Sequence, residues 1–173
     1  MLERYKNVDG LASAWRSVAP RIPHARLRIV GSGALAAIVQ RLAEDLPKQT
    51  AWDRQLTPAA VAAALDDSTC LVLPSRSEGM GRVVVEAFCR GRPVIGSRVG
   101  GIPDLVVDDV NGLLVEPGDG VALECALLRV LSNAETAERL AAGAHASAAV
   151  WAISPHEFAQ RIRALVERVA GLS

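Results

Sequence analysis

Short apolar runs alternate along the first two thirds of the chain with segments whose apolar residues follow helical spacing. The runs typical of strands are RLRIVG (26–31), a weak one at 50–53, CLVLP (70–74), RPVIGS (92–97) and LLVEP (113–117). The helical segments between them are 7–19, 34–46, 58–67, 82–90 and a short one within 100–106. Strands that alternate with helices predict a doubly wound, Rossmann-like α/β fold, with helices on both faces of a parallel sheet.

The last third of the chain shows no strand pattern. Residues 121–132, 134–148 and 155–171 have helical spacing, and Ser154, Pro155 and Glu157 are a typical start for the last helix. We therefore expect one domain over residues 1–150. A C-terminal helix over 151–173 would pack either on this domain or on another half. The sequence begins with a helix, so we expect the sheet to lack its first strand, and expect the chain to be a fragment or to need a missing N-terminal region.

Two loops follow strands that should end at the same edge of the sheet. The run 70–74 is continuously apolar, as in a strand buried on both faces, and SRSEGMG (75–81) follows it. The strand at 92–97 leads into RVGG in the same way. Ligands of doubly wound sheets bind at the carboxyl ends of strands. Gly79 and Gly81 would let the backbone approach a ligand closely.

The helix that follows the first loop has features that suit a nucleotide. The amides of Gly81, Arg82 and Val83 open this helix, and free amides at a helix start attract a diphosphate. Glu86 lies about 6 Å further along the axis. Its carboxylate could accept hydrogen bonds from the two hydroxyls of a ribose. Glu78, outside the helix start, would then lie on the side of the transferred group.

A simpler explanation of Glu86 is a solvated surface position, which is the commoner place for a helical glutamate. Its sequence neighbours are Val83, Val84, Val85, Ala87 and Phe88. A helix so apolar offers little polar face, which favours a partner for the carboxylate. On spacing alone, both interpretations stay open.

Composition excludes several classes of partner. The chain has 173 residues, with 19 basic and 19 acidic side chains and 3% aromatics, which argues against nucleic acid. Cys70, Cys89 and Cys125 lie far apart in apolar runs, so we expect buried thiols in a reducing compartment rather than disulfides. The three histidines show no ligand spacing, so no metal site is expected. No apolar stretch reaches the roughly 18 residues of a membrane span, and we expect a soluble, cytoplasmic protein.

Residues 74–119 resemble the donor-binding half of the retaining glycosyltransferases of family 4, which have the two-domain GT-B fold. The resemblance is carried by Glu78 and Glu86, which have seven residues between them, by Gly91-Arg92-Pro93-Val94 and by Gly100-Gly101-Ile102-Pro103-Asp104. YKNVDGL (5–11) is similar to the Lys-Gly-Val-Asp segment of that half, and RLRIVGSG is similar to its second strand. The resemblance extends over nearly the whole chain.

The resemblance implies a role for each matching residue. Glu86 would bind the ribose, Glu78 would hold the donor sugar and stabilise charge at its anomeric carbon, and Lys6 would neutralise the leaving phosphate. The amides of Arg82 and Val83 would contact the diphosphate, and Leu56 would lie near the base. Apart from the resemblance, Gly31 is expected at a tight strand-to-helix turn that borders the cleft. Transfer from a UDP- or GDP-sugar would retain configuration without a metal or other cofactor. An N-terminal acceptor half, in the same or another chain, would complete the enzyme and provide any membrane contact.

Two alternatives compete with this interpretation. Gly31-Ser32-Gly33-Ala34-Leu35-Ala36 follows a strand and opens a helix, with Asp53 twenty residues past Gly33, as in an NAD-binding fingerprint. That fingerprint leaves both glutamates unexplained, and the glycines also suit a tight strand-to-helix turn. The other alternative is a truncated, non-catalytic half that only binds a partner. Intact Lys6, Glu78 and Glu86 argue against a decayed donor site.

Overall fold

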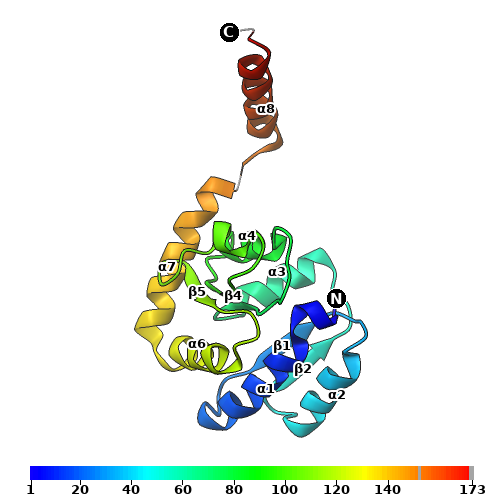
Figure 1. Cartoon of the computed structure of the whole chain (residues 1–173). Coiled ribbons are helices and arrows are strands. Elements are labelled where there is room, and N and C mark those ends of the chain that lie inside the picture. Colours follow the sequence, from blue (N-terminus) through cyan, green and yellow to red (C-terminus); the bar gives the residue numbers. More distant parts are fainter. Residues whose placement is uncertain (152, 172–173) are drawn as a thin grey trace.

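The computed structural model describes residues 1–151 and 153–171, and Figure 1 shows the arrangement of their helices and strands. The five strands are β1 (Leu27–Val30), β2 (Thr50–Asp53), β3 (Leu71–Leu73), β4 (Val94–Ser97) and β5 (Gly112–Val115). The helices up to β5 are η1 (Arg4–Lys6), α1 (Val8–Val18), η2 (Ala19–Arg21), α2 (Ala36–Asp45), α3 (Pro58–Asp66), α4 (Arg82–Phe88) and α5 (Ile102–Leu105). After β5 come α6 (Gly120–Ser132), α7 (Ala134–Trp151) and α8 (Pro155–Ala170). The predicted strands are all present, whereas the short helix η1 was not predicted.

All strand pairs are parallel, which confirms the predicted α/β class, but the strands form two separate sheets. β1 pairs with β2, and β4 lies between β3 and β5. The registers place Leu27 opposite Thr50, and Leu71 opposite Val94. Within residues 1–151 and 153–171, each of β1 and β3 therefore has a strand neighbour on one side only.

Two apolar clusters, one on each face, hold the helices against the strands. The first includes Trp15, Leu42 and Leu127 of α1, α2 and α6, all 1% exposed or less. The Trp15 indole donates a hydrogen bond of 3.2 Å to the buried hydroxyl of Thr50. The second cluster includes Phe88 of α4 and Ala144 of α7, together with residues of α3 and α5. Helices thus cover both sides of the strands, as predicted.

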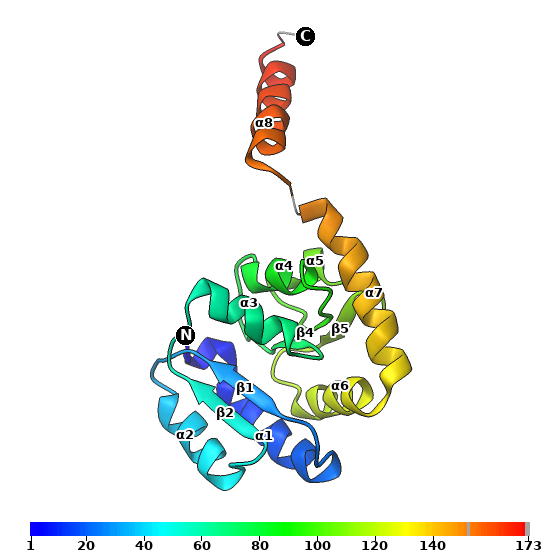
Figure 2. The same ribbon diagram turned by 180° about the vertical axis from the view of Figure 1, so that it is seen from behind.

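One face of the β1–β2 pair is uncovered, as seen from behind in Figure 2. Leu27 and Ile29 of β1 point into the first cluster and are buried. The alternate residues Arg28 and Val30, with Ala51 opposite Arg28, are exposed. The burial of β1 thus alternates with period two, because its helices lie on one face only.

β3 is less buried than its continuous apolar sequence predicted. Leu71, Val72 and Leu73 are all half-buried. Val72 packs against the first cluster, and Leu71 and Leu73 pack against the second, so both faces of the strand are covered. We attribute the remaining exposure to the edge of β3 that faces β1, where no strand is paired.

The prediction of three buried cysteines is wrong for two of them. Cys89 and Cys125 are exposed, because Cys89 follows the end of α4 and Cys125 falls on the outward side of α6. Cys70 is half-buried as a residue, but it packs against the first cluster, and burial raises the pKa of its thiol to about 12. The Cys70 thiol therefore stays protonated at neutral pH.

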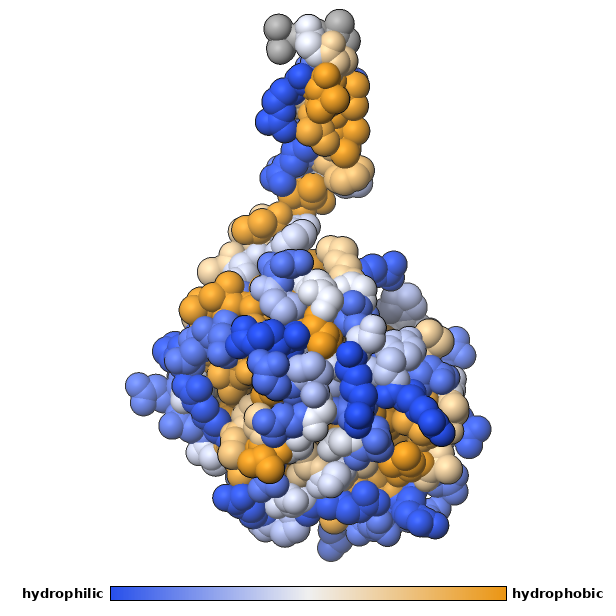
Figure 3. All heavy atoms as spheres, viewed as in Figure 1, coloured by the Kyte–Doolittle hydropathy of each residue, from blue (hydrophilic) through white to orange (hydrophobic). Residues whose placement is uncertain are grey.

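The C-terminal helix α8 stands clear of the rest of the molecule (Figures 1 and 2). It begins with the predicted cap, in which the Ser154 hydroxyl accepts from the Glu157 amide at 3.2 Å and the Glu157 carboxylate accepts from the Ser154 amide at 2.7 Å. No described residue of α8 is buried, so this helix does not cover the sheet. Figure 3 shows an apolar face along it, formed by Phe158, Ile162, Leu165, Val166 and Val169. The predicted boundary near residue 150 falls at the end of α7. Of the predicted C-terminal segment 151–173, residues 152, 172 and 173 lie outside the described residues.

Candidate active site at the carboxyl ends of the strands

The loops after β3 and β4 meet at one edge of the sheet, as predicted. The Gly101 amide donates a hydrogen bond of 2.7 Å to the Gly79 carbonyl oxygen. At Gly100 the φ angle is +53°, and an added Cβ would lie 1.8 Å from the carbonyl oxygen of Glu78. Only glycine allows so close an approach of the two backbones. The two loops therefore form one surface.

The N-terminal segment joins this surface to the carboxyl end of β1. The Leu2 amide donates to the Ser32 carbonyl at 2.9 Å, and the Arg76 amide donates to the Tyr5 carbonyl at 2.6 Å. Residues 2–5 thus run from the end of β1 to the loop after β3. This path places Lys6, the last residue of η1, beside that loop.

Lys6 and Glu78 form an ion pair at the place where these segments meet. The Lys6 Nζ lies 2.5 Å from the Glu78 Oε2, and the two side chains are only 22% and 13% exposed. The buried Ser75 hydroxyl donates to the same oxygen at 3.2 Å, and the Gly79 amide donates to Oε1 at 3.2 Å. The structure thus brings together the two residues assigned to catalysis from the sequence.

The surroundings of Glu78 keep its carboxylate ionised. Burial by itself raises the pKa of Glu78, because it disfavours the charged form. The hydrogen bond and charge of Lys6, with smaller contributions from Gly79 and Ser75, outweigh this effect. The pKa of Glu78 is therefore lower than the ordinary glutamate value.

Two neighbours of the ion pair were missed by the sequence analysis. Asn7 is buried, has a φ angle of +54°, and its side-chain oxygen accepts from Arg76 Nε at 3.1 Å and Nη2 at 2.8 Å. Ser75 is fully buried under Glu78. An asparagine just before a helix tolerates a left-handed conformation, which is the signal that could have identified Asn7. Ser75 belongs to the loop 75–81 that the sequence analysis singled out, but nothing in the sequence indicates that its side chain is buried.

Glu86 lies on the exposed side of α4, and no partner for its carboxylate is found among the described residues. The expectation that this helix has little polar face is wrong. Arg82 and Glu86 are four residues apart on α4 and both exposed, with exposed Arg90 in the turn that follows, so α4 has a polar face. The apolar sequence neighbours of Glu86 point to other sides of the helix. Its contact with a ribose stays a prediction.

The start of α4 has the features expected of an anion-binding turn. Gly81 is buried with a φ angle of +69°, and it precedes the first helical residue, Arg82. Among the described residues, no acceptor is found for the amides of Arg82 and Val83. A Cβ at Gly79 would meet nothing within 4 Å, so the space beside this residue is open.

The Gly31–Gly33 turn is filled by the chain itself. Gly31 has a φ angle of +137° and lies against Met1 and Leu2. The Leu35 amide, at the start of α2, donates to the Leu2 carbonyl at 2.9 Å, and the Ala34 amide donates to a Glu3 carboxylate oxygen at 3.3 Å. These contacts occupy the place that the pyrophosphate of a dinucleotide would need.

The acidic residue of the dinucleotide fingerprint is also engaged. The Asp53 carboxylate accepts from Arg28 Nε at 2.7 Å. Both observations argue against NAD binding and favour a structural turn. Leu56 is half-buried between β2 and α3, and no contact joins it to Lys6 or Glu78 among the described residues.

A pocket of about 360 Å³ lies next to η1. It is lined by Arg4, Asp9, Leu35, Ile38 and Arg76. The charges of Arg4 and Arg76 are partly balanced by Asp9, whose carboxylate oxygen lies 3.5 Å from Arg76 Nη2, so the pocket adds one net positive charge to the edge near Lys6. In residues 1–151 and 153–171, no group of three His, Cys, Asp or Glu side chains is placed to hold a metal ion. Within the same residues, no helix has the length and hydropathy that crossing a membrane requires.

Residues 1–146 match the protein family described as glycosyl transferases, group 1. The sulfoquinovosyl transferase SQD2 of Arabidopsis thaliana is 34% identical over 126 residues, which are 71% of this chain and 24% of that protein. A GDP-mannose-dependent phosphatidylinositol monomannoside mannosyltransferase of Mycolicibacterium smegmatis is 29% identical over 96% of this chain and 45% of its own length. The chain thus spans less than half the length of these relatives.

Solved structures of similar proteins have the same fold. The sucrose-phosphate synthase of Thermosynechococcus elongatus superimposes with a TM-score of 0.80 and 26% identity, over 99% of this chain and 44% of that one. The C-terminal domain of LpcC, a group 1 family glycosyl transferase of Francisella tularensis, superimposes with a TM-score of 0.77 and 19% identity. That match covers 86% of this chain and 80% of that domain, so the chain has the fold of one half of a GT-B enzyme.

Proposed function

The chain belongs to the group 1 glycosyltransferases, and from this membership we propose that it is the donor-binding half of a retaining hexosyltransferase. The donor is a UDP- or GDP-linked sugar, and the acceptor is a hydroxyl group held by a separate acceptor half. The two relatives named above carry different sugar names, sulfoquinovosyl and mannosyl. They support the reaction class and leave the sugar and the base open.

The Lys6–Glu78 pair is the observation that carries this proposal. It brings a cation and an anion from segments 72 residues apart in the chain to the edge where doubly wound sheets bind ligands. In the free chain the two groups neutralise each other. When a nucleotide-sugar binds, Lys6 turns to the leaving phosphate, and Glu78 accepts hydrogen bonds from the sugar hydroxyls and stabilises positive charge at the anomeric carbon.

The rest of the donor lies along the start of α4. The diphosphate meets the amides of Arg82 and Val83, which have no acceptor among the described residues. The open space at Gly79 and the tight turn at Gly81 allow its approach. Glu86, exposed one turn further, accepts from the ribose hydroxyls, and the base extends toward Leu56.

The reaction exchanges one bond for another at the anomeric carbon. The bond from this carbon to the phosphate oxygen breaks, and a bond to the acceptor oxygen forms on the same face. The acceptor proton passes to the leaving phosphate, so no metal is required. Without an acceptor half, water is not excluded from the site. The 173-residue chain alone therefore binds nucleotide weakly and transfers little or no sugar.

Thermal unfolding in the presence of nucleotides tests the donor site. We expect UDP or GDP to raise the melting temperature and NAD to leave it unchanged, because a ligand at 100 times its Kd stabilises the folded state by about 2.7 kcal/mol. Glu86→Gln should remove most of the shift without changing the melting temperature of the free protein, since Glu86 is exposed. Glu167→Gln on the distant helix α8 is the matched control and should keep the full shift. Stabilisation by NAD alone would overturn the proposal.

A further inference from the structure

The pocket of about 360 Å³ beside η1 has one charged wall and one apolar wall. Arg4, Asp9 and Arg76 form the charged wall, and Leu35 and Ile38, both packed against the first cluster, form the apolar wall. We name it the η1 pocket. Pockets that bind small molecules have volumes of about 300–1,000 Å³ and are mostly apolar, with a few polar groups that orient the ligand. The η1 pocket therefore suits a small ligand that has a carbon skeleton and a charged group.

Arg76 is held in place along one side of its guanidinium group. Its Nε and Nη2 donate to the Oδ1 of buried Asn7 at 3.1 and 2.8 Å, and Nη2 also lies 3.5 Å from a carboxylate oxygen of Asp9. No acceptor for Nη1 is found in the part of the chain that the structure describes. A guanidinium group that is already oriented loses little conformational freedom when it binds an anion. Arg76 therefore has a donor group ready for a ligand.

Arg4 supplies the second positive charge of the η1 pocket. Its side chain is exposed, and within residues 1–151 and 153–171 neither an ion pair nor a hydrogen bond of its guanidinium group is found. Among the lining residues Asp9 alone has a carboxylate, so two positive charges face one negative charge. This balance favours an anionic ligand over a neutral or a cationic one.

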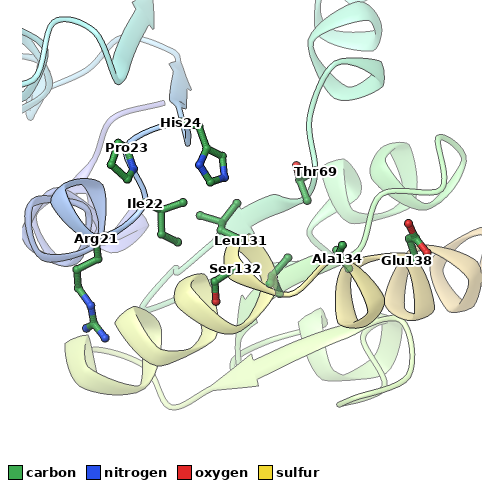
Figure 4. A pocket seen from close by; sticks show the side chains of 11 residues that line it. Arg21, Ile22, Pro23, His24, Thr69, Leu131, Ser132, Ala134 and Glu138 are labelled. Carbon is green, nitrogen blue, oxygen red and sulfur yellow. The ribbon is translucent and has the colours of Figure 1, made fainter.

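A larger pocket, of about 540 Å³, lies at the opposite edge of the strands (Figure 4). His24 lines it from the segment before β1 and Thr69 from the segment before β3, so it lies at the amino ends of the strands. Arg21 and Glu138 line it at opposite sides, and Arg21 forms an ion pair of 3.0 Å with Glu124. Of these two pockets, only the η1 pocket combines an unpaired arginine with a place at the carboxyl ends of the strands.

The η1 pocket adjoins the Lys6–Glu78 pair through both of its arginines. Arg4 and Lys6 both belong to η1 and are two residues apart, which is about 4 Å along the axis of a 3-10 helix. Arg76 and Glu78 are two residues apart in the loop after β3, and the Arg76 amide donates to the Tyr5 carbonyl at 2.6 Å. A ligand in the η1 pocket therefore lies beside the place where the proposed function puts the transferred sugar.

We propose that the η1 pocket binds the phosphate group of a phosphorylated sugar or polyol, and that this molecule is the acceptor of the transfer. Arg4 and Arg76 bind the phosphate oxygens, and Leu35 and Ile38 contact the carbon skeleton. A phosphate monoester has a charge of about −1.5 to −2 at neutral pH and three acceptor oxygens, so it can engage two guanidinium groups at once. The phosphate stays on the acceptor, and the hydroxyl group that receives the sugar is held by the acceptor half. The role as acceptor rests on the proposed function, whereas phosphate binding does not.

Titration of the whole chain with glucose 6-phosphate, followed through the NMR signals of the Leu35 and Ile38 methyl groups, tests the site. We expect saturable shifts with glucose 6-phosphate and none with glucose at the same concentration. Arg4→Gln should weaken the binding about tenfold, because it removes a charge-assisted hydrogen bond. Asp9→Asn should strengthen the binding about threefold, because it removes the carboxylate that repels the phosphate. Arg21→Gln, in the larger pocket, is the matched control and should leave the affinity unchanged.

The same titration with excess UDP and GDP separates the η1 pocket from the donor site. We expect glucose 6-phosphate to bind as tightly as before, because the two sites adjoin without overlapping. Saturable binding that the Arg4 and Asp9 substitutions change in opposite directions supports the proposal, and unfolding of a variant cannot produce the tighter binding. No saturable shift, equal shifts with glucose, substitutions that leave the affinity unchanged, or displacement of glucose 6-phosphate by the nucleotides overturns it. If neither nucleotide binds, the donor-site proposal fails together with the acceptor role, while the first titration still decides phosphate binding.

Discussion

The Lys6–Glu78 pair joins two parts of the chain that are 72 residues apart. Both side chains are largely shielded from water, so each relies on the other to balance its charge. Loss of one partner from such a pair costs more than the pair contributes, because the remaining charge keeps its desolvation penalty. The pair thus stabilises the free chain at the place where the donor has to bind.

Glu78→Gln should lower the free energy of unfolding by about 1.5–3 kcal/mol, the range for hydrogen bonds to charged groups. Urea denaturation at pH 7 measures this loss. The matched control is Glu86→Gln, which removes an exposed carboxylate and should stay within about 0.5 kcal/mol of the parent chain. Equal effects of the two substitutions would show that the ion pair does not exist in solution.

The same pair predicts a dependence of stability on pH. Folding lowers the pKa of Glu78, so the unfolded chain binds its proton more readily. The stabilisation is therefore complete above the unfolded value, near pH 4.3, and is lost as the pH falls through the lower, folded value. The difference in unfolding free energy between the parent and Glu78→Gln should be constant from pH 7 to pH 5.5 and shrink below about pH 4. A difference that grows on acidification would contradict this assignment.

Sequence reasoning found the charged residues of the site but not the groups that hold them. Glu78 and Lys6 were identified by a resemblance, and the structure brings them together. Ser75 and Asn7 escaped, because burial and a left-handed backbone depend on tertiary contacts. The environment of Glu86 was misjudged from its neighbours along the chain, whereas residues three and four apart share a helix face.

Strands and helices were predicted closely because turn residues separate them. Gly91 follows α4 with a φ angle of +62°, Pro58 opens α3, and Asp119 caps α6 through the Ala122 amide at 2.9 Å. The division into two sheets could not be read from the sequence, since apolar runs do not specify their neighbours. The short helix η1 escaped for a similar reason, because its position depends on contacts with Ser32 and Arg76.

Gly100→Ala tests the contact between the loops after β3 and β4. The added Cβ would fall 1.8 Å from the Glu78 carbonyl oxygen at a backbone φ of +53°, so both contact and conformation become strained. We expect a loss of at least about 2 kcal/mol in unfolding free energy, measured by urea denaturation.

Gly120→Ala is the control for this substitution. Gly120 begins α6, and an added Cβ there meets nothing within 4 Å. Alanine favours the helix over glycine by up to about 1 kcal/mol, so this variant should equal or exceed the parent in stability. Full stability of Gly100→Ala would mean that the two loops are apart in solution.

At the scale of the whole molecule, the chain is an α/β body with helices on both faces of its strands, and helix α8 stands outside it (Figure 1). The family match ends at residue 146, within α7, so it covers the α/β body and does not include α8. Helix α8 was predicted from its spacing, but an amphipathic pattern specifies an apolar face and not the surface that covers it. The structure leaves this face uncovered by the body, and contact with an acceptor half, the second of the two positions that the sequence left open, stays a prediction.

Removal of α8 tests whether the body is stable by itself. Among the residues that the structure describes, a chain that ends at Trp151 loses none that is buried, so its melting temperature should stay within about 2 °C of the parent. A chain that ends at Asn133 also loses α7, whose Leu140 and Ala144 are fully buried, and should unfold or melt far lower. Circular dichroism during heating measures both. A fall of more than about 5 °C for the first truncation would show that α8 folds back onto the body in solution, which would remove it as a contact for the acceptor half.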